Sequence, residues 1–548
     1  MSTTGGGPTR ALSEKHQILR STRVVTFFTL LSRFFGYARD LAVAMLLGTS
    51  RAGDAFVIAF RIPNLLRRLM AEGAMTGAFI PVFTSYRSEQ TEAESWDLVR
   101  RMFWTLATVL AGVTVLGVIF APQLVRLFTL FSREPEQWSL AVDLTRITFP
   151  YCVLVALTAL AGAALNTVRV FGLPASVPIF LNIAIITAAV AAWWGDMADP
   201  AIALALGVVL GGLLQLLVQL PALLRRGMRF GFRLGFGHAG VRRVARLMLP
   251  AVAGVGVYQI NVLVSTIFAS QEEGWIAALY YADRLMEVAL GAYAISVATV
   301  VLPVMSRQAA EKKFDEMRST LEFSLRNVAF IVVPATVGLI LLREPLVRML
   351  FQHRAFGSTS TELTAWALLF YALGLPAFSA VRLLVQGFYA TQDTATPVRV
   401  AVVALVANVV LCFLLVGPLR HGGLALATSL ASYLNFLILY MIFRRRLGAV
   451  NEARLAFSVG RALAAAAGMG ALLWLLRTEW SWMSAPGLAQ LLPACLATVA
   501  AGMASYLALA WLLRAEELSE VYTLVTGRRM KEGIPRVQAA VPYTPNQK

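Results

Sequence analysis

Apolar stretches long enough to cross a lipid bilayer recur along the whole chain. Of its 548 residues 58% are apolar and 14% are charged, whereas soluble globular proteins carry about 45–50% apolar and about 25% charged residues. Because a helix spans the hydrocarbon core with about 20 apolar residues, the pattern predicts an all-α polytopic membrane protein and excludes a soluble enzyme. The 14 stretches run over 22–47, 54–86, 98–122, 139–166, 173–195, 200–224, 244–270, 275–306, 322–343, 362–390, 396–417, 421–443, 456–477 and 487–513.

Similar motifs recur in the two halves of the chain. FIPVFTSYRSEQTEAE (79–94) is similar to VLPVMSRQAAEKKFDE (301–316), 222 residues later, and two further pairs lie 223 and 226 residues apart. Chance recurrence of proline at helix ends is the alternative. Since six is even, two six-helix halves would enter the membrane in the same sense, as parallel lobes with a substrate site between them. The expected segments are a tail at 1–20, an N-lobe at 21–226, a basic linker at 227–243, a C-lobe at 244–447, two extra helices at 455–514 and a tail at 515–548.

Positive charge is distributed unevenly over the predicted loops. The net charge is +18, from 48 Lys and Arg against 30 Asp and Glu. If the N-terminus is cytoplasmic, the loops and tails on that side hold 30 of the basic residues and the outer loops hold 8. This bias agrees with the positive-inside rule and explains the charge without a nucleic-acid partner. We therefore expect both termini in the cytoplasm, with no cleaved signal peptide.

The most informative residues are charges inside the predicted spans. An arginine at the centre of a bilayer costs at least about 2.5–3.5 kcal/mol, so such residues face the protein interior or water. Two isolated arginines lie in the fourth and tenth spans. The clusters lie in the first, second and eighth spans and comprise Arg33, Arg39, Asp40, Asp54, Arg61, Arg67, Arg68, Glu72, Asp283, Arg284 and Glu287.

These charges predict a water-filled cavity with a net positive charge. Arg33 lies 11 residues into its span, which places it about 16 Å deep at 1.5 Å per residue. Guanidinium groups offer planar pairs of donors that suit a phosphate or pyrophosphate. For the acids, the alternative is an ion pair that only locks helices together, and Arg61 has the alternative of an interfacial anchor. Since Arg67 and Arg68 are about 100° apart on a helix, only one of them faces the cavity directly.

Motifs of enzymes and metal sites are absent from the sequence. We find no GxxxxGK[ST] phosphate loop, no HExxH and no GxSxG motif. The three cysteines are far apart in apolar stretches, which is typical of small buried residues rather than of a metal site. We therefore expect no catalytic residue, no metal site and no cofactor.

Four motifs resemble one family of membrane proteins. LSRFFGYARD (31–40), GDAFVIAFRIPNLLRRLMAEGAMTGAFIPVF (53–83), YYADRLME (280–287) and GFYATQDTATPV (387–398) are similar, in order, to the MurJ (MviN) family. These are bacterial lipid II flippases of the multidrug/oligosaccharidyl-lipid/polysaccharide (MOP) exporter superfamily. The resemblance implies 14 membrane helices around a central cationic cavity.

The resemblance also implies a function and a location. Such proteins lie in the inner (cytoplasmic) membrane and move lipid II, an undecaprenyl-pyrophosphate glycopeptide, to the outer leaflet for peptidoglycan synthesis. The implied mechanism is alternating access of the two lobes, and the last two helices would form a groove for the lipid tail. Lipid II, membrane lipids and the cell-wall synthesis machinery are the implied partners. The family's cavity arginines correspond to Arg33, Arg39, Arg67 and Arg284, and acidic positions of the same motifs correspond to Asp40, Asp54, Glu72 and Glu287.

One departure concerns the driving force. Some family members carry a sodium site with acids in spans 7, 11 and 12, where this sequence has only Asn261, Asn408 and Cys412 as polar candidates. The coupling ion is therefore open, and the membrane potential acting on cavity charge is a hypothesis. Three alternatives to a lipid II flippase remain: a MOP exporter of another polyprenyl-linked saccharide or a drug, a membrane transferase, and a scaffold for cell-wall assembly.

Overall fold

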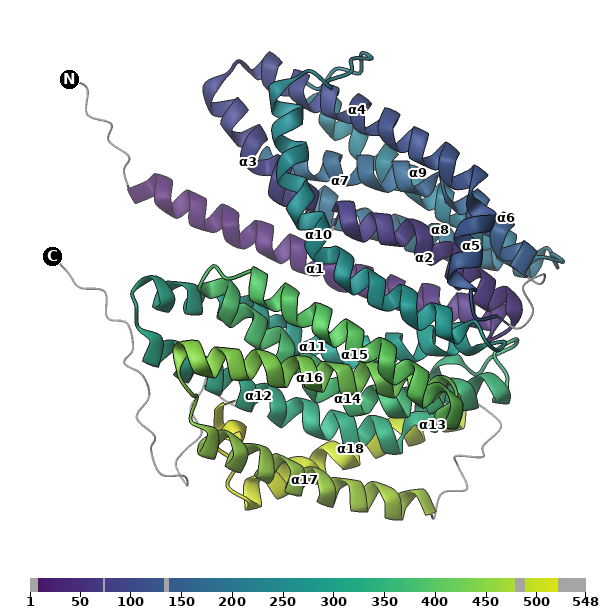
Figure 1. Cartoon of the computed structure of the whole chain (residues 1–548), viewed down its shortest axis with the longest axis vertical. Helices are drawn as coiled ribbons and strands as arrows, with labels where there is room; N and C mark the ends of the chain where they lie inside the picture. The colour runs from purple at the N-terminus through teal and green to yellow at the C-terminus, as the bar shows by residue number, and fades with distance from the viewer. Residues whose placement is uncertain (1–7, 72–73, 133–137, 479–487, 521–548) are drawn as a thin grey trace. The chain divides into compact units, whose positions relative to one another are not determined.

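A computed structural model of the chain describes residues 8–71, 74–132, 138–478 and 488–520. These residues form helices and connecting turns, without a strand among them (Figure 1). Ten helical segments in this part of the chain are long and apolar enough to cross a membrane. The chain is therefore an all-helical, multi-pass membrane protein.

The predicted apolar stretches coincide with one helix or two consecutive helices each. Four of them are not among the ten segments that meet the length and composition criteria. Three of those four contain the charged clusters described above, which lower their apolar character. The exact number of crossings remains a prediction. The four stretches are 22–47, 54–86, 244–270 and 275–306.

Local sequence signals explain several helix boundaries. Thr91 and Glu94 form a capping box, in which the Thr91 hydroxyl accepts the Glu94 N–H at 3.3 Å and Glu94 Oε2 accepts the Thr91 N–H at 3.0 Å. Pro150 separates two helices within the stretch predicted at 139–166. Pro63, in contrast, lies inside a continuous helix.

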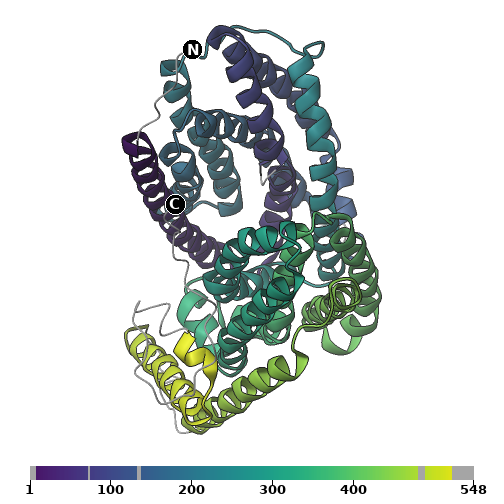
Figure 2. The ribbon, with the colours of Figure 1, turned by 90° about the vertical axis from the view of Figure 1, so that its left-hand side faces the viewer.

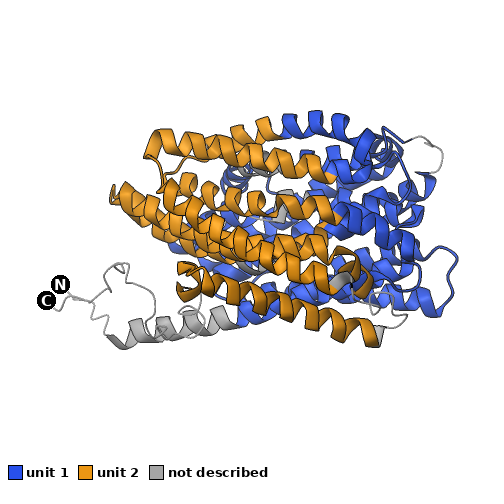
Figure 3. Cartoon of the chain, turned by 90° about the horizontal axis from the view of Figure 1, so that it is seen from below, with its two compact units in different colours: residues 1–282, 350–367, 405–424 blue, residues 283–349, 368–404, 425–548 orange. Residues whose placement is uncertain are grey.

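The chain divides into two compact units (Figure 3). The first contains residues 1–282, 350–367 and 405–424, and the second contains residues 283–349, 368–404 and 425–548. The expected lobe boundaries at 226 and 244 remain a prediction. The helices that lie wholly in the first unit are α1 (Pro8–Leu47), α2 (Arg51–Ala71), α3 (Ala74–Glu89), α4 (Glu92–Ile119), α5 (Ala121–Phe128), α6 (Ser139–Thr148), α7 (Tyr151–Thr167), α8 (Gly172–Trp194), α9 (Pro200–Arg225) and α10 (Ala239–Ala269).

The second unit is built around helices from the C-terminal half of the chain. Its α12 packs against α17, which runs alongside α18 (Figure 1, Figure 2). Small residues of α17, Ala462, Ala465 and Ala466, are buried at this contact. The remaining helices are α11 (Trp275–Ala310), α12 (Phe314–Leu341), α13 (Arg343–Phe351), α14 (Ser358–Ala390), α15 (Ala395–Leu419), α16 (His421–Leu447), α17 (Glu452–Thr478) and α18 (Leu488–Leu512), of which α11 and α13–α16 contribute to both units.

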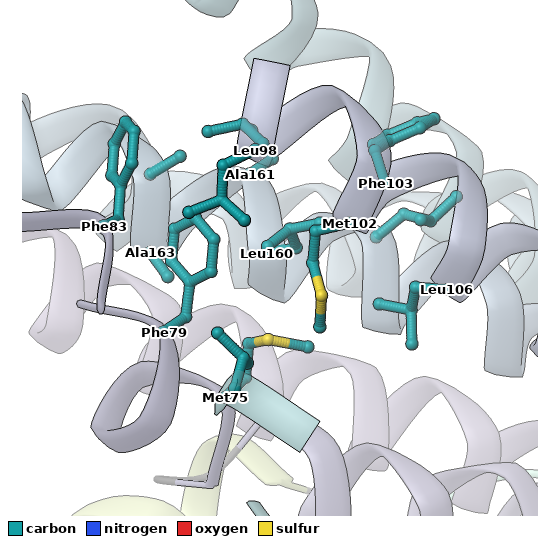
Figure 4. Packing of buried hydrophobic residues seen from close by; sticks show 14 of the residues in the cluster. Met75, Phe79, Phe83, Leu98, Met102, Phe103, Leu106, Leu160, Ala161 and Ala163 are labelled. Carbon is teal, nitrogen blue, oxygen red and sulfur yellow. The ribbon is translucent and has the colours of Figure 1, made fainter. Parts of the chain in front are cut away.

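The first unit contains a core of large apolar side chains (Figure 4). Phe79 and Phe83 of α3 lie one helical turn apart and stack with their ring centroids 5.3 Å apart. Met102 of α4 and Leu160 of α7 are buried in the same cluster. This core joins α3, α4 and α7.

Two glycines of α9 allow a close approach to α8. Gly207 and Gly211 are four residues apart and therefore share one face of the helix. A Cβ atom at Gly211 would lie 2.9 Å from the Cα atom of Leu181, and one at Gly207 would lie 2.7 Å from the Cβ atom of Ala188. Such close backbone contact is how membrane helices associate without a hydrophobic driving force.

We expect Gly211→Ala to destabilise the protein by about 1–3 kcal/mol, because the added methyl group forces the backbones of α8 and α9 apart. Thermal unfolding of the purified protein in detergent measures the effect. Gly112→Ala in α4 is the matched control, since a Cβ atom there meets no atom within 4 Å. Equal unfolding temperatures for the two variants would contradict the close approach.

Candidate functional site

Arg39 and Asp40 of α1 form an ion pair that has further polar partners. Arg39 Nη2 lies 2.7 Å from Asp40 Oδ1, which also accepts the hydroxyl of Tyr280 at 3.0 Å. Arg39 Nη1 donates to Asn182 Oδ1 of α8 at 3.1 Å. The guanidinium lies 5.8 Å from the ring centroid of Phe60. Groups from α1, α2 and α8 thus contact the Arg39 side chain, and Tyr280 of α11 acts on it through Asp40.

Asp54 has a structural role at the start of α11. Its side chain is 1% exposed. Its two oxygens accept the backbone N–H groups of Gly274 at 2.6 Å and Ala277 at 2.7 Å. The first N–H groups of a helix have no partner inside the helix and favour a negative charge. Asp54 of α2 therefore caps α11. This contact corresponds to the alternative in which the acid locks helices together rather than serving as a cavity charge.

We expect Asp54→Ala to lower stability by about 1.5–3 kcal/mol, because two buried N–H groups lose a charged acceptor. Asp54→Asn should have an intermediate effect, since its amide has one acceptor oxygen for two donors. Thermal unfolding in detergent measures both. Asp199→Ala is the control, because Asp199 is the N-cap of α9 and its side chain makes no capping bond. The capping role is wrong if Asp54→Ala unfolds at the same temperature as Asp199→Ala.

Arg61 and Arg67 of α2 have polar partners in the first unit. Arg61 Nη1 donates to the hydroxyl of Thr266 in α10. Arg67 Nε donates to Asn64 Oδ1 at 2.5 Å. Arg68 lies in α2, but its side chain is outside the described residues, and so is all of Glu72. Which of Arg67 and Arg68 faces a cavity therefore remains a prediction.

Arg33 lies seven residues before Asp40 on α1, two helical turns away on the same face. Arg33 is exposed, and its apolar neighbours Leu30 and Phe34 are 63% and 66% exposed. This stretch of α1 therefore presents both a guanidinium and large apolar side chains at the surface of the first unit.

The charges of the eighth span belong to the second unit. Arg284 Nη1 lies 2.5 Å from Glu287 Oε2, one turn along α11. Asp283 is half-buried. That Arg284 lines the same cavity as the arginines of α1 and α2 remains a prediction.

The contacts around Asp54 were not predicted from the sequence. The Thr49 and Ser360 hydroxyls lie 2.8 Å apart, and the Ala355 N–H donates to the Met45 carbonyl at 3.2 Å. Arg51 Nε lies 2.9 Å from Glu273 Oε2. All of these residues lie in or next to loops that were expected on the outer side. Their pairing spans up to 311 positions, so no local sequence signal indicates it.

Sequence analysis also missed a buried charge cluster in the second unit. Arg326 of α12 is 2% exposed, and its Nη2 atom lies 2.6 Å from Glu517 Oε1 and 3.1 Å from Glu516 Oε2. Glu322, four residues before Arg326, lies 3.8 Å away and is also buried. This i,i+4 spacing was the only signal in the sequence. The cluster joins α12 to the segment that follows α18.

The polar residues of the seventh and eleventh predicted spans contact each other. Asn408 of α15 donates to Asn261 Oδ1 of α10 at 2.8 Å. Cys412 is buried, and α10, α15 and α16 contain no Asp or Glu. The amide contact joins α10 to α15.

Comparison with known proteins finds similar chains among lipid II flippases. The family model described as "Lipid II flippase MurJ" matches residues 43–490. The chain is 37% identical to the probable lipid II flippase MurJ of Vibrio cholerae over 91% of its own length and 96% of that protein's. It is 35% identical to the lipid II flippase MurJ of Burkholderia cenocepacia, covering 90% and 97% of the two chains.

Solved structures show the same fold. The inward closed conformation of a lipid II flippase MurJ is similar with a TM-score of 0.74 and 26% identity, and the match covers 92% of this chain and 99% of that one. An inward-facing multidrug transporter of the MATE family, of the MOP superfamily, matches with a TM-score of 0.65 and 13% identity over 78% and 98% of the two chains.

Proposed function

Because the chain belongs to the MurJ family of lipid II flippases, we propose that it moves lipid II by alternating access and binds the pyrophosphate through cavity arginines. It is a flippase rather than an enzyme, and it serves peptidoglycan synthesis. The proposed ligands of the pyrophosphate are Arg33, Arg39, Arg67 and Arg284. The proposed supporting charges are Asp40, Asp54, Arg61, Arg68, Glu72, Asp283 and Glu287.

The charge balance of α1 and α2 supports this proposal. The described side chains of the predicted clusters on these helices include four arginines, Arg33, Arg39, Arg61 and Arg67, and two acids, Asp40 and Asp54, a formal balance of +2. Asp54 accepts two backbone N–H groups, so its charge is committed to α11. An excess of guanidinium groups favours an anionic ligand with several oxygens, such as a pyrophosphate.

The bonds of Arg39 prepare it for such a ligand. Asp40 and Asn182 fix the plane of the guanidinium, and Tyr280 in turn holds Asp40. A donor that is already oriented loses less conformational entropy when the ligand binds. We therefore assign Arg39 to orientation of the pyrophosphate, with Asp40 as its positioning residue.

Alternating access requires contacts that form in one state and break in another. We propose that the bonds around Thr49, Arg51 and Asp54 close the outer side and break when the substrate is released there. The buried Asp54 cap and the exposed Arg51–Glu273 pair are the groups that would separate.

The finer architecture belongs to the same proposal. It comprises 14 membrane helices, two parallel six-helix lobes, both termini in the cytoplasm, and a groove for the lipid tail beside α17 and α18. The exposed Trp474, Leu475 and Trp511 support an apolar surface on these two helices. The cell-wall synthesis machinery is the proposed protein partner.

Transport of lipid II by the purified protein tests the function. The protein is reconstituted in liposomes with fluorescent lipid II, and protection from a quencher added outside reports movement between leaflets. We expect the wild-type protein to move lipid II faster than protein-free liposomes do. Movement of another polyprenyl-linked saccharide but not of lipid II would favour the alternative exporter.

The same liposomes test the driving force. One elementary charge crossing a potential of 100 mV changes the free energy by about 2.3 kcal/mol. We therefore expect the transport rate to fall when an ionophore dissipates an imposed potential, and to be insensitive to replacement of sodium by potassium at equal ionic strength. A rate that depends on sodium and ignores the potential would contradict this proposal.

A further inference from the structure

An extended segment, residues 226–238, joins α9 to α10 and lies along α4. We call it the strap. The Phe230 ring lies 5.5 Å from Phe103, and the Phe232 ring lies 5.2 Å from Trp104, centroid to centroid. The Gly235 N–H donates to the hydroxyl of Thr105 at 2.8 Å. The strap is therefore held in place on the first turns of the apolar part of α4.

The strap exposes apolar side chains although it is attached firmly. Large apolar side chains at positions 232, 234 and 236 are exposed, and so is Arg233 between them. Phe232 is 66% exposed, Phe236 is 53% exposed and Leu234 is 40% exposed. Such large exposed side chains at fixed positions mark an interaction surface.

Positive charge surrounds these apolar side chains. The sequence contains no Asp or Glu between Asp199 and Glu272. The acid in contact with the strap is Asp97 of α4, which lies 3.4 Å from Arg233 and also binds Arg100 and Arg101. One carboxylate cannot neutralise the exposed arginines in and beside the strap, which are Arg225, Arg226, Arg229, Arg233, Arg242, Arg243 and Arg246.

The combination of phenylalanine and arginine indicates a lipid surface. Segments that lie in the plane of a membrane interface insert aromatic side chains at the acyl boundary and place basic side chains among anionic headgroups. The strap begins directly after α9 and lies beside α4, and both helices are long and apolar enough to span the membrane. The strap thus lies next to the ends of membrane helices, where headgroups are available.

We propose that the strap binds anionic phospholipid headgroups at the bilayer interface, with Phe232 and Phe236 at the acyl boundary and Arg229 and Arg233 on the phosphates. This surface would hold the chain between α9 and α10 against the membrane. It does not depend on how the protein binds lipid II.

A fluorophore next to Phe236 can report which lipid is near. Gly237 is a suitable site, because it is exposed and a Cβ atom there would meet no atom within 4 Å. Labelling of Gly237→Cys is selective, since the three native cysteines are buried. The labelled full-length protein is reconstituted in phosphatidylcholine vesicles that contain a small fraction of a nitroxide-labelled lipid, either phosphatidylglycerol or phosphatidylcholine with the same acyl-chain nitroxide.

We expect stronger quenching by the nitroxide on phosphatidylglycerol, because each arginine near an anionic surface favours association by about fivefold. High salt should reduce the difference, since it screens exposed charges. Arg229→Gln/Arg233→Gln should bring the two nitroxides close to equal, whereas Phe232→Ser/Phe236→Ser should reduce quenching by both.

Arg126→Gln/Arg420→Gln is the matched control, because it removes two exposed arginines that lie far from the strap in sequence and should leave the preference unchanged. Equal quenching by the two nitroxides, for a label on the otherwise unchanged protein, overturns the proposal. Absence of quenching by both nitroxides also overturns it and would assign the strap to a protein partner. If Arg229→Gln/Arg233→Gln fails to fold, the salt dependence of the difference in quenching between the two nitroxides tests the role of charge. This difference is measured on the labelled protein that keeps both arginines.

Discussion

Replacing Arg33, Arg67 or Arg284 with alanine is expected to abolish rescue of a bacterium depleted of its own lipid II flippase. A charge-assisted hydrogen bond contributes about 1.5–3 kcal/mol, so loss of one guanidinium weakens binding of the pyrophosphate by about 10- to 100-fold. Growth of the depleted strain measures rescue, and accumulation of lipid II in the inner leaflet shows that transport has failed.

Lysine variants separate charge from geometry. Arg33→Lys and Arg67→Lys keep the positive charge but lose the planar pair of donors. We expect partial rescue from lysine and none from alanine. Arg146→Ala is the control, because Arg146 is exposed and pairs with the exposed Asp143 at 3.4 Å, a contact that contributes about 0–1 kcal/mol. Full rescue by the triple variant Arg33→Ala/Arg67→Ala/Arg284→Ala, with membrane levels equal to wild type, would overturn the binding role of these arginines.

The helices were predictable because apolar stretches of bilayer length have no other stable form in lipid. The stretch at 139–166 shows the limit, since it contains two helices that meet at Pro150. A hydropathy pattern records apolar length but does not show where one helix ends and the next begins within it.

The roles of individual charges were harder to predict than their presence. Asp40 and Asp54 both read as charges inside a span, but Asp40 accepts bonds from Arg39 and Tyr280 while Asp54 caps α11. Tyr280 and Ala277 lie more than 200 positions along the chain from these acids. The sequence shows that a buried charge needs a partner, and only the tertiary contacts show which partner it has.

Arg326 illustrates the same limit at the end of a helix. It lies five residues into the stretch at 322–343, where a long side chain can be read as reaching the interface. The structure instead buries it among acids from α12 and from the segment after α18. The acids after α18 lie 190 or more positions away from Arg326, so its visible partner in the sequence was Glu322 alone.

Replacing Arg326 with methionine is expected to destabilise the protein by about 3–5 kcal/mol, because the change removes one partner of a buried ion cluster and leaves its carboxylates close together. Glu322, Glu516, Glu517 and Glu520 surround the guanidinium, and Arg454 shares Glu516 at 2.7 Å. Thermal unfolding in detergent measures the loss. Arg399→Met is the control, since Arg399 is exposed and its substitution should change stability by about 0.5 kcal/mol or less.

The pH dependence of the Arg326→Met variant distinguishes lost charge from lost packing. Burial raises the pKa of Glu520, and the positive charge of Arg326 opposes that rise. Without the guanidinium, the pKa of Glu520 rises further above its unfolded value. A carboxyl with a raised folded pKa favours folding when it is protonated. The variant should therefore regain stability as the pH falls through that raised pKa, by more than the wild type does. A stability difference that is constant with pH would attribute the effect of Arg326 to packing alone.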